Sequence, residues 1–257
     1  MNIHGLPTES GMRKKMPAIE DLIEGDVATF QEVFHVRARH ELHDVEGHPY
    51  VFMPNMHVKL FGSGLATVSE HPIVKTKFMP YGRAANWDFF VSKGVQLTQI
   101  QHPQLGVVDI YNTHLQASYR NSKQHARVRM RQLAQLVRFI QKHSMPGHTI
   151  ILCGDFNMHP ESPEYAYLTR ALPGAVDILS QLHPPSGPVT FVGDPASHWY
   201  SGGGTPQAQR LDYVFVIPAE GLRLKLEDCT AQASMYPEGQ ALSDHLPLEI
   251  KMVFERK

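Results

Sequence analysis

Short apolar runs separated by turn signals recur along most of this chain, and that alternation limits the folds it can adopt. Runs of this length, rich in apolar and β-branched side chains and bounded by turn residues, are typical of β-strands. We predict strands at 26–30, 64–68, 94–98, 107–111, 149–152, 211–216 and 246–253.

Two other segments have apolar residues at helical spacing. In the first, one face carries Met16, Ile19, Leu22 and Ile23. In the second, at 123–143, an apolar stripe is formed by Leu133, Leu136, Val137 and Ile140. The opposite face of this second helix carries Arg127, Arg131 and Arg138, which we interpret as a solvated surface.

Many strands combined with a few amphipathic helices favour a layered α/β sandwich, with two sheets face to face and helices outside. The chain has 257 residues and contains no Pro/Ser/Gly-rich linker and no internal repeat. It is therefore predicted to form a single domain over residues 1–257. Loops at the strand ends would then hold the chemistry.

The composition narrows the classes of function. The formal net charge is −1, so no broad basic field is present to hold a nucleic-acid backbone, although a local basic groove stays open. Cys153 lies inside an apolar run that reads as a buried strand, which favours a free thiol over a disulfide with Cys229.

Five short segments each place an acid, amide or imidazole beside an apolar run. Taken alone, the polar residue of each segment is most simply explained as a turn or cap residue. Together, and in this order, they indicate a catalytic site built at strand ends. They span 2–6, 30–33, 113–115, 154–157 and 243–245, with a further segment at 210–213.

These segments resemble the signature of the endonuclease/exonuclease/phosphatase superfamily over nearly the whole chain. Further segments are similar to the neutral sphingomyelinases, at 64–65 with 69–73, 88–94, 111–115 and 154–160. The resemblance implies a DNase I-like fold, a four-layer α/β/β/α sandwich of two mostly antiparallel sheets.

A strand should lead into the first motif, and none precedes Asn2. We therefore expect the natural chain to start upstream, with its first strand and a targeting segment outside this sequence. A secreted or membrane-peripheral location is favoured, and a cytoplasmic one stays open.

Phosphodiester cleavage requires a neutralised phosphate, an activated water and a stabilised leaving oxygen. Glu32 offers the oxygen ligand that Mg²⁺ prefers, and Mn²⁺ or Co²⁺ could substitute for Mg²⁺. Asn2 would support this metal site either as an amide oxygen ligand or as an orienting residue. By resemblance, Asp244 lies beside the metal.

His245 is the expected general base, because an imidazole titrates near neutral pH. The resemblance makes Asp212 its carboxylate partner. Asp155 would orient the water or serve the leaving group. His114 and Asn157 would donate hydrogen bonds to the phosphoryl oxygens as charge builds in the transition state.

The pair Asp88 and Lys93 matches a loop pair that helps to form the active site of the resembled enzymes. Lys93 could add a cation there with Asp88 holding it, while the alternative is an ordinary surface lysine. Three further histidines next to motifs are assigned no chemistry: His4, His71 and His159.

The preferred hypothesis is a sphingomyelinase-type phospholipase C that acts as a monomer on a phospholipid at a membrane surface and forms no stable nucleic-acid complex. The alternatives are an endonuclease or other phosphodiesterase or phosphatase of the superfamily, and a catalytically dead binding module. The long apolar hairpin of some bacterial sphingomyelinases is not evident. The stretch 191–200, with Trp199 and Tyr200, would be a shorter substitute for it.

Overall fold

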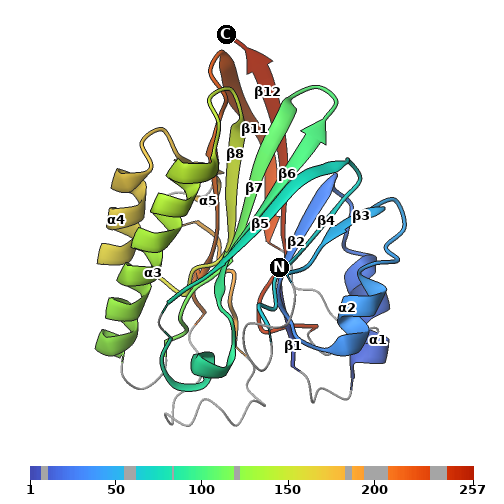
Figure 1. Cartoon of the computed structure of the whole chain (residues 1–257), viewed down its shortest axis with the longest axis vertical. Coiled ribbons are helices and arrows are strands. Elements are labelled where there is room, and N and C mark those ends of the chain that lie inside the picture. Colours follow the sequence, from blue (N-terminus) through green and yellow to red (C-terminus); the bar gives the residue numbers. More distant parts are fainter. Residues whose placement is uncertain are drawn as a thin grey trace.

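The computed structural model of the chain describes residues 1–6, 11–54, 62–82, 84–118, 122–182, 187–193, 208–231 and 242–257. Two β-sheets lie face to face, with helices against their outer faces (Figure 1). Most neighbouring strands are antiparallel, so the predicted α/β sandwich of two mostly antiparallel sheets is confirmed.

The first sheet has the strand order β1-β2-β4-β3, and only its β1–β2 pair is parallel. Its strands are β1 (Asn2–Gly5), β2 (Val27–Val33), β3 (Tyr50–Phe52) and β4 (Ala66–Ser69). Helices α1 (Met12–Glu20) and α2 (Val36–Glu41) cover its outer face. Met16 and Ile19 of α1 are fully buried there in a cluster with Phe30 of β2.

The second sheet has the order β5-β6-β7-β8-β10-β9, and its β7–β8 pair is parallel. Its strands are β5 (Ile73–Pro80), β6 (Gly94–His102), β7 (Gly106–His114), β8 (Thr149–Asp155), β9 (Val176–Asp177) and β10 (Asp212–Ile217). Successive side chains of β7 point to opposite faces of the sheet. Ile110 faces the first sheet, whereas Tyr111 faces the helices outside.

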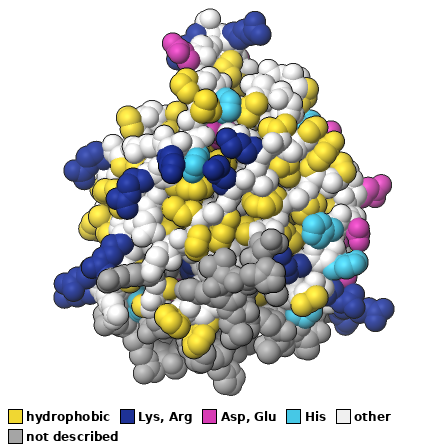
Figure 2. All heavy atoms as spheres, in the orientation of Figure 1, with side chains coloured by type: hydrophobic (Ala, Val, Ile, Leu, Met, Phe, Trp, Pro, Cys, Tyr) yellow, Lys and Arg dark blue, Asp and Glu magenta, His cyan; other side chains and the backbone are white. Residues whose placement is uncertain are grey.

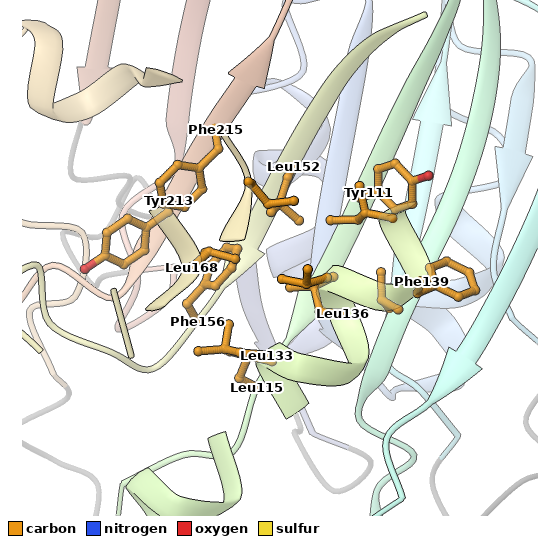
Figure 3. Close-up of a cluster of buried hydrophobic side chains, with 14 of the residues drawn as sticks. Tyr111, Leu115, Leu133, Leu136, Phe139, Leu152, Phe156, Leu168, Tyr213 and Phe215 are labelled. Atoms are coloured by element: carbon orange, nitrogen blue, oxygen red, sulfur yellow. The ribbon is translucent and has the colours of Figure 1, made fainter. Parts of the chain in front are cut away.

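Helices α3 (Ser122–His143) and α4 (Pro163–Ala171) cover the outer face of the second sheet. Figure 3 shows Leu133, Leu136 and Phe139 of α3 directed toward the side chains of Tyr111 and Leu152 on the sheet. The predicted apolar stripe of α3 is therefore the face that it buries. Its opposite face, with Arg127, Arg131 and Arg138, is exposed as predicted.

A two-stranded ribbon, β11 (Leu222–Ala231) with β12 (Leu248–Arg256), completes the described structure. Helix α5 (Ile178–Leu182) packs between this ribbon and β10. Cys229 of the ribbon and Cys153 of β8 are both buried, and Cys153 is a free thiol, as predicted.

All seven predicted strands and both predicted helices coincide with observed elements, but one detail differs. Leu22 lies beyond α1 and is 39% exposed, because the helix ends at Glu20, where Asp21 caps it. Asn2 itself begins β1, and the strand expected upstream of Asn2 lies outside this sequence and stays a prediction. In the described part of the chain, no helix combines the length and apolarity that a membrane crossing requires.

Candidate active site

The predicted residues gather at one end of the two sheets, where three neighbouring strands of the second sheet bring their polar ends together. His114 ends β7 and pairs with Asp155, which ends β8. Asp155 pairs on its other side with Asp212, the first residue of β10. Strand register alone therefore aligns three of the predicted residues.

These residues and His245 form a buried row of alternating carboxylates and imidazoles. His114 Nε2 lies 3.4 Å from Asp155 Oδ2, and His245 Nε2 lies 3.6 Å from the same oxygen. His245 Nδ1 is 2.8 Å from Asp212 Oδ2. All four side chains are at most 7% exposed. Asp155 therefore lies between two imidazole rings, and Asp212 supports the far side of His245.

Glu32 faces this row from the first sheet, and Asn2 links the two. Asn2 Nδ2 lies 3.1 Å from both Glu32 Oε1 and Asp155 Oδ2, while Asn2 Oδ1 accepts a hydrogen bond from the His4 amide at 3.0 Å. The amide nitrogen thus faces the two carboxylates and the oxygen is engaged elsewhere. The role of Asn2 at a metal site, as an amide oxygen ligand or as an orienting residue, stays a prediction.

Glu32 is held in an unusual backbone conformation. Its φ is 60°, and those of Asn157 and His4 are also positive. Non-glycine residues with positive φ are uncommon and cluster at functional sites. Gly154 is needed for a related reason, since a Cβ there would lie 2.0 Å from the Thr113 carbonyl oxygen. The site end of β8 can approach β7 only with glycine at that position.

Below Glu32, the fully buried Asn112 of β7 joins the two sheets. Its Nδ2 donates to the carbonyl oxygens of Phe30 and Ala66, each at 3.0 Å, and its Oδ1 accepts from Gln31 Nε2 at 2.7 Å. Phe30 and Ala66 form the last pair of the β2–β4 ladder. Asn112 therefore fixes β2 over β7 at the point where β2 turns toward the site and presents Glu32.

Lys93 enters the site from the segment that follows η2 (Asn86–Phe90), a short 3₁₀ helix. Its Nζ lies 2.9 Å from His114 Nε2 and 3.2 Å from Asp88 Oδ2, and it donates to the Leu115 carbonyl at 2.8 Å. Asp88 in turn accepts from the Ala117 amide at 3.0 Å. Lys93 is only 4% exposed, so the alternative of an ordinary surface lysine is wrong.

Burial and neighbouring charges shift the pKa values along the row. Burial opposes the charged form of His245, but Asp212 and Asp155 outweigh it and raise its pKa to about 10. Burial, together with the charge of Asp212, raises the pKa of Asp155 to about 7, against the opposing effect of His245. Burial, Lys93 and His245 all lower the pKa of His114 well below its usual value. His114 is therefore neutral, which suits its acceptance of a hydrogen bond from Lys93 Nζ.

The remaining predicted residues lie beside the row. Asn157 is half-buried. Its backbone amide donates to Asp155 Oδ1 at 2.9 Å, and its side-chain Nδ2 donates to the Leu115 carbonyl at 3.2 Å. Asp244, also half-buried, is among the carboxylates that raise the pKa of His245. Trp199 and Tyr200 lie outside the described residues.

The sequence analysis missed three supporting residues. Ser243 Oγ donates to the Asn2 carbonyl at 2.7 Å and accepts from the His245 amide at 3.2 Å, which ties the first and last motifs together. Thr190 Oγ1 accepts from the Asp212 amide at 3.0 Å. The ring of Phe191 packs edge-on against His245 at 4.9 Å. Ser243 stands in a motif and could have been found, whereas Thr190 and Phe191 lie in no recognisable pattern.

The donor set fits a hard divalent cation. Glu32 Oε1 and Asp155 Oδ2 both accept a hydrogen bond from Asn2 Nδ2, so two carboxylates lie close together at the site. Asp155, Asp212 and His245 also offer ligand atoms that lie within 4.8 Å of one another. Carboxylate oxygens are the ligands that Mg²⁺ prefers.

A sandwich of two sheets with acids and imidazoles at one end agrees with the superfamily that the motifs resemble. A family model described as "Endonuclease/Exonuclease/phosphatase family" matches residues 1–245. The chain belongs to that family.

Two curated relatives share part of the sequence. The inositol phosphosphingolipids phospholipase C of Schizosaccharomyces pombe is 30% identical over 151 residues, 56% of this chain and 36% of that protein. Human sphingomyelin phosphodiesterase 2 is 31% identical over 173 residues, 63% of this chain and 40% of that protein. The chain thus matches well under half the length of either relative.

Solved structures agree on the fold. A Staphylococcus aureus beta toxin variant with bound magnesium ions matches with a TM-score of 0.73 and 20% identity, over 97% of each chain. D. rerio TDP2 complexed with a single-strand DNA product matches with a TM-score of 0.76 and 15% identity, over 98% of this chain and 96% of that one. At these identities, the likeness concerns the fold alone.

Proposed function

We propose that this chain is a Mg²⁺-dependent phosphodiesterase of the sphingomyelinase type, which hydrolyses sphingomyelin to ceramide and phosphocholine. The observation that carries the proposal is the buried row Asp212–His245–Asp155–His114, with Glu32 opposite it. It supplies a base with its orienting carboxylate, a second acid with a raised pKa, and a carboxylate for a cation. The names of the two curated relatives support a phosphosphingolipid substrate.

Glu32 would hold Mg²⁺, with Asn2 orienting its carboxylate and Asp244 nearby. When bound, the cation supplies a Lewis acid for a phosphoryl oxygen and for the leaving oxygen. Mn²⁺ or Co²⁺ would substitute, because they accept the same oxygen donors.

His245 takes the proton from the attacking water. Asp212 accepts the Nδ1 hydrogen and so leaves the Nε2 lone pair free for this step. The high pKa of the metal-free ring comes from Asp212 and Asp155, so positive charge placed beside Asp155 lowers it toward neutral pH. Asp212 then stabilises the imidazolium that forms.

The water oxygen bonds to phosphorus in line as the bond from phosphorus to the ceramide oxygen breaks. Asp155, with its raised pKa, donates a proton to that oxygen. Lys93 turns from His114 to the developing negative charge, so Nε2 of His114 no longer accepts from it. The proton of the neutral ring then moves from Nδ1 to Nε2, from which His114 donates to a phosphoryl oxygen. Asn157 adds a second side-chain donor at the same edge.

The proposal is tested by release of phosphocholine from sphingomyelin, phosphatidylcholine and lysophosphatidylcholine, with and without Mg²⁺. Nicking of plasmid DNA is measured under the same conditions. We expect Mg²⁺-dependent release from sphingomyelin that exceeds plasmid nicking by orders of magnitude. The net charge of −1 supports this order.

An inositol phosphosphingolipid completes the set, because one relative is named for that substrate. Turnover of that lipid alone would keep the phospholipase C reaction and correct the headgroup. Efficient plasmid nicking without phosphocholine release would replace the proposal by the endonuclease alternative. No turnover of any substrate, despite a folded chain and bound Mg²⁺, would favour the binding module.

A further inference from the structure

In the segment 81–92, of which residue 83 lies outside the described residues, an exposed aromatic pair stands next to a residue of the catalytic site. Asp88 is 5% exposed and holds Lys93, whereas the next two residues, Phe89 and Phe90, are 62% and 44% exposed. Their rings pack edge-on against each other at 5.6 Å. Large apolar side chains in this position are costly in water.

Other exposed apolar side chains flank the opposite side of the site. Val189 and Val192, each 39% exposed, lie on either side of Phe191, which packs against His245. Exposed apolar residues therefore border the catalytic row from two separate segments. Figure 2 shows hydrophobic atoms at the lower edge of the molecule, where Figure 1 shows η2 as the short teal helix.

A basic groove lies beside the same segment. It has a volume of about 420 Å³ and is bordered by Gly82, Arg131, Gln135 and Arg138, among others. The Gly82 amide donates to Gln135 Oε1 at 3.2 Å, which fastens the start of the segment to α3. In Figure 2, Lys and Arg side chains occupy the flank where Figure 1 places α3 and α4. Arg131 and Arg138 are both exposed, so the groove can receive a phosphate group.

We propose that Phe89 and Phe90, with the arginine groove on α3, form a docking surface for an anionic phospholipid bilayer. The inference rests on the proposed function, because a sphingolipid must leave a bilayer to reach the catalytic row. Aromatic side chains enter the boundary between headgroups and acyl chains, while arginines beside them bind anionic headgroups. Docking through this segment places the bilayer next to Lys93 and His114.

The two parts of the surface make different contributions. The aromatic pair acts on any bilayer, because burial of apolar area does not depend on headgroup charge. The arginines act only on anionic bilayers, and salt screens their effect. Each part can therefore be removed separately.

Binding is measured by co-sedimentation with phosphatidylcholine vesicles, with and without phosphatidylserine. Phe89→Ser combined with Phe90→Ser should weaken binding to both vesicles about tenfold or more. Arg131→Ala combined with Arg138→Ala should weaken binding several-fold, on anionic vesicles only, with the difference vanishing at high salt. Circular dichroism checks that each variant is folded.

Matched controls come from the opposite end of the molecule. Val74 is 55% exposed near the far end of the second sheet, and Arg223 is exposed on β11. Val74→Ser and Arg223→Ala should bind vesicles like the wild type. Turnover of the water-soluble diester bis-(p-nitrophenyl) phosphate should be unchanged in all variants, because none of these residues belongs to the catalytic row.

The readouts separate docking from catalysis. Vesicle binding by the Phe89 and Phe90 variant equal to that of the Val74 control would overturn the docking surface, even if sphingomyelin is hydrolysed. Vesicle binding that depends on these residues without any phosphocholine release would keep the docking surface and reject the proposed function. Loss of plasmid binding in the arginine variant, with vesicle binding unchanged, would assign the groove to nucleic acid and overturn its part in docking.

Discussion

Two clusters of the same residue types lie at opposite ends of the sheets. At the catalytic end are Asp155, Asp212 and His245; at the other end are Asp26, His71 and His102. In both clusters the potential ligand atoms lie within 4.8 Å of one another. They differ in burial, since the first three side chains are buried, whereas Asp26 is exposed and the two histidines are half-buried.

The rings of His245 and His102 also differ in the hydrogen bonds that their nitrogens make. His245 Nδ1 is held by a carboxylate, which leaves Nε2 free to accept a proton. His102 Nδ1 accepts hydrogen bonds from the amides of Gln104 and Leu105, each at 3.2 Å. Its proton must then lie on Nε2, which faces Asp26 Oδ2 at 3.7 Å. A protonated Nε2 cannot act as a base or bind a metal, so proximity of acids and imidazoles alone does not make a catalytic site.

The largest expected effect breaks the catalytic cluster at His245. General-base catalysis contributes roughly 10²–10⁴-fold, so His245→Ala should lower kcat by at least that factor. Asp212→Asn should cost less, because the ring survives in a poorer position, and the double variant should resemble His245→Ala alone. The limb of the pH–rate profile near neutrality should disappear with His245.

The matched control at the other end is His102→Ala, which should keep wild-type kcat. Multiplicative losses for His245 and Asp212 would mean that they act independently, and the base would then be reassigned, most directly to Asp155.

The second prediction concerns the cation. Glu32→Gln keeps the shape of the side chain and a partner for Asn2 but removes a charge from the metal site. Activity at limiting Mg²⁺ should fall by about tenfold or more, with partial recovery in excess Mg²⁺. Calorimetric titration with Mg²⁺ measures the weaker binding directly. Wild-type activity of Glu32→Gln in chelator-treated buffer with limiting Mg²⁺ would remove Glu32 from the metal site.

A smaller effect should follow from loosening the contact between the sheets below Glu32. Asn112→Leu leaves the carbonyls of Phe30 and Ala66 without their buried donor, at about 1–3 kcal/mol of unfolding free energy for each. Because β2 then presents Glu32 less accurately, Mg²⁺ affinity should fall about tenfold.

Gln99→Leu provides the control, since it removes a buried hydrogen bond from the Gln99 side-chain amide to Asp109 at the far end of the same sheet. It should destabilise the chain without changing the Mg²⁺ titration. Equal Mg²⁺ affinity in both variants would limit Asn112 to a purely structural role.

The sequence showed the catalytic end more clearly than the supporting structure. Strand runs and motif residues lie next to each other in the chain, so the positions of the motif residues at the ends of β7, β8 and β10 followed from local patterns, whereas the register of these strands did not. The ribbon strand β11 was missed although Leu222, Leu224 and Leu226 alternate with polar residues. The roles of Asn112 and Thr190 could not be predicted, because they depend on which sheet faces which and on loops that return from far along the chain.

The smallest expected effect concerns the open cluster, as a dependence of stability on pH. Burial lowers the pKa of His102 from its usual 6.5, His71 lowers it further, and Asp26 and Glu70 oppose the shift. The unfolded chain therefore binds the proton more readily, so the folded state loses stability as pH falls below about 6.5. His102→Gln removes this loss. Between pH 7.5 and pH 5, the melting temperature of the wild type should fall further than that of the variant, by about one degree. Titrating groups other than Asp26, Glu70 and His71 act alike in both proteins, because they are distant from the substitution. Parallel melting curves across this pH range would show that Asp26 compensates fully for burial, and the two clusters would then differ in catalysis but not in their response to protons.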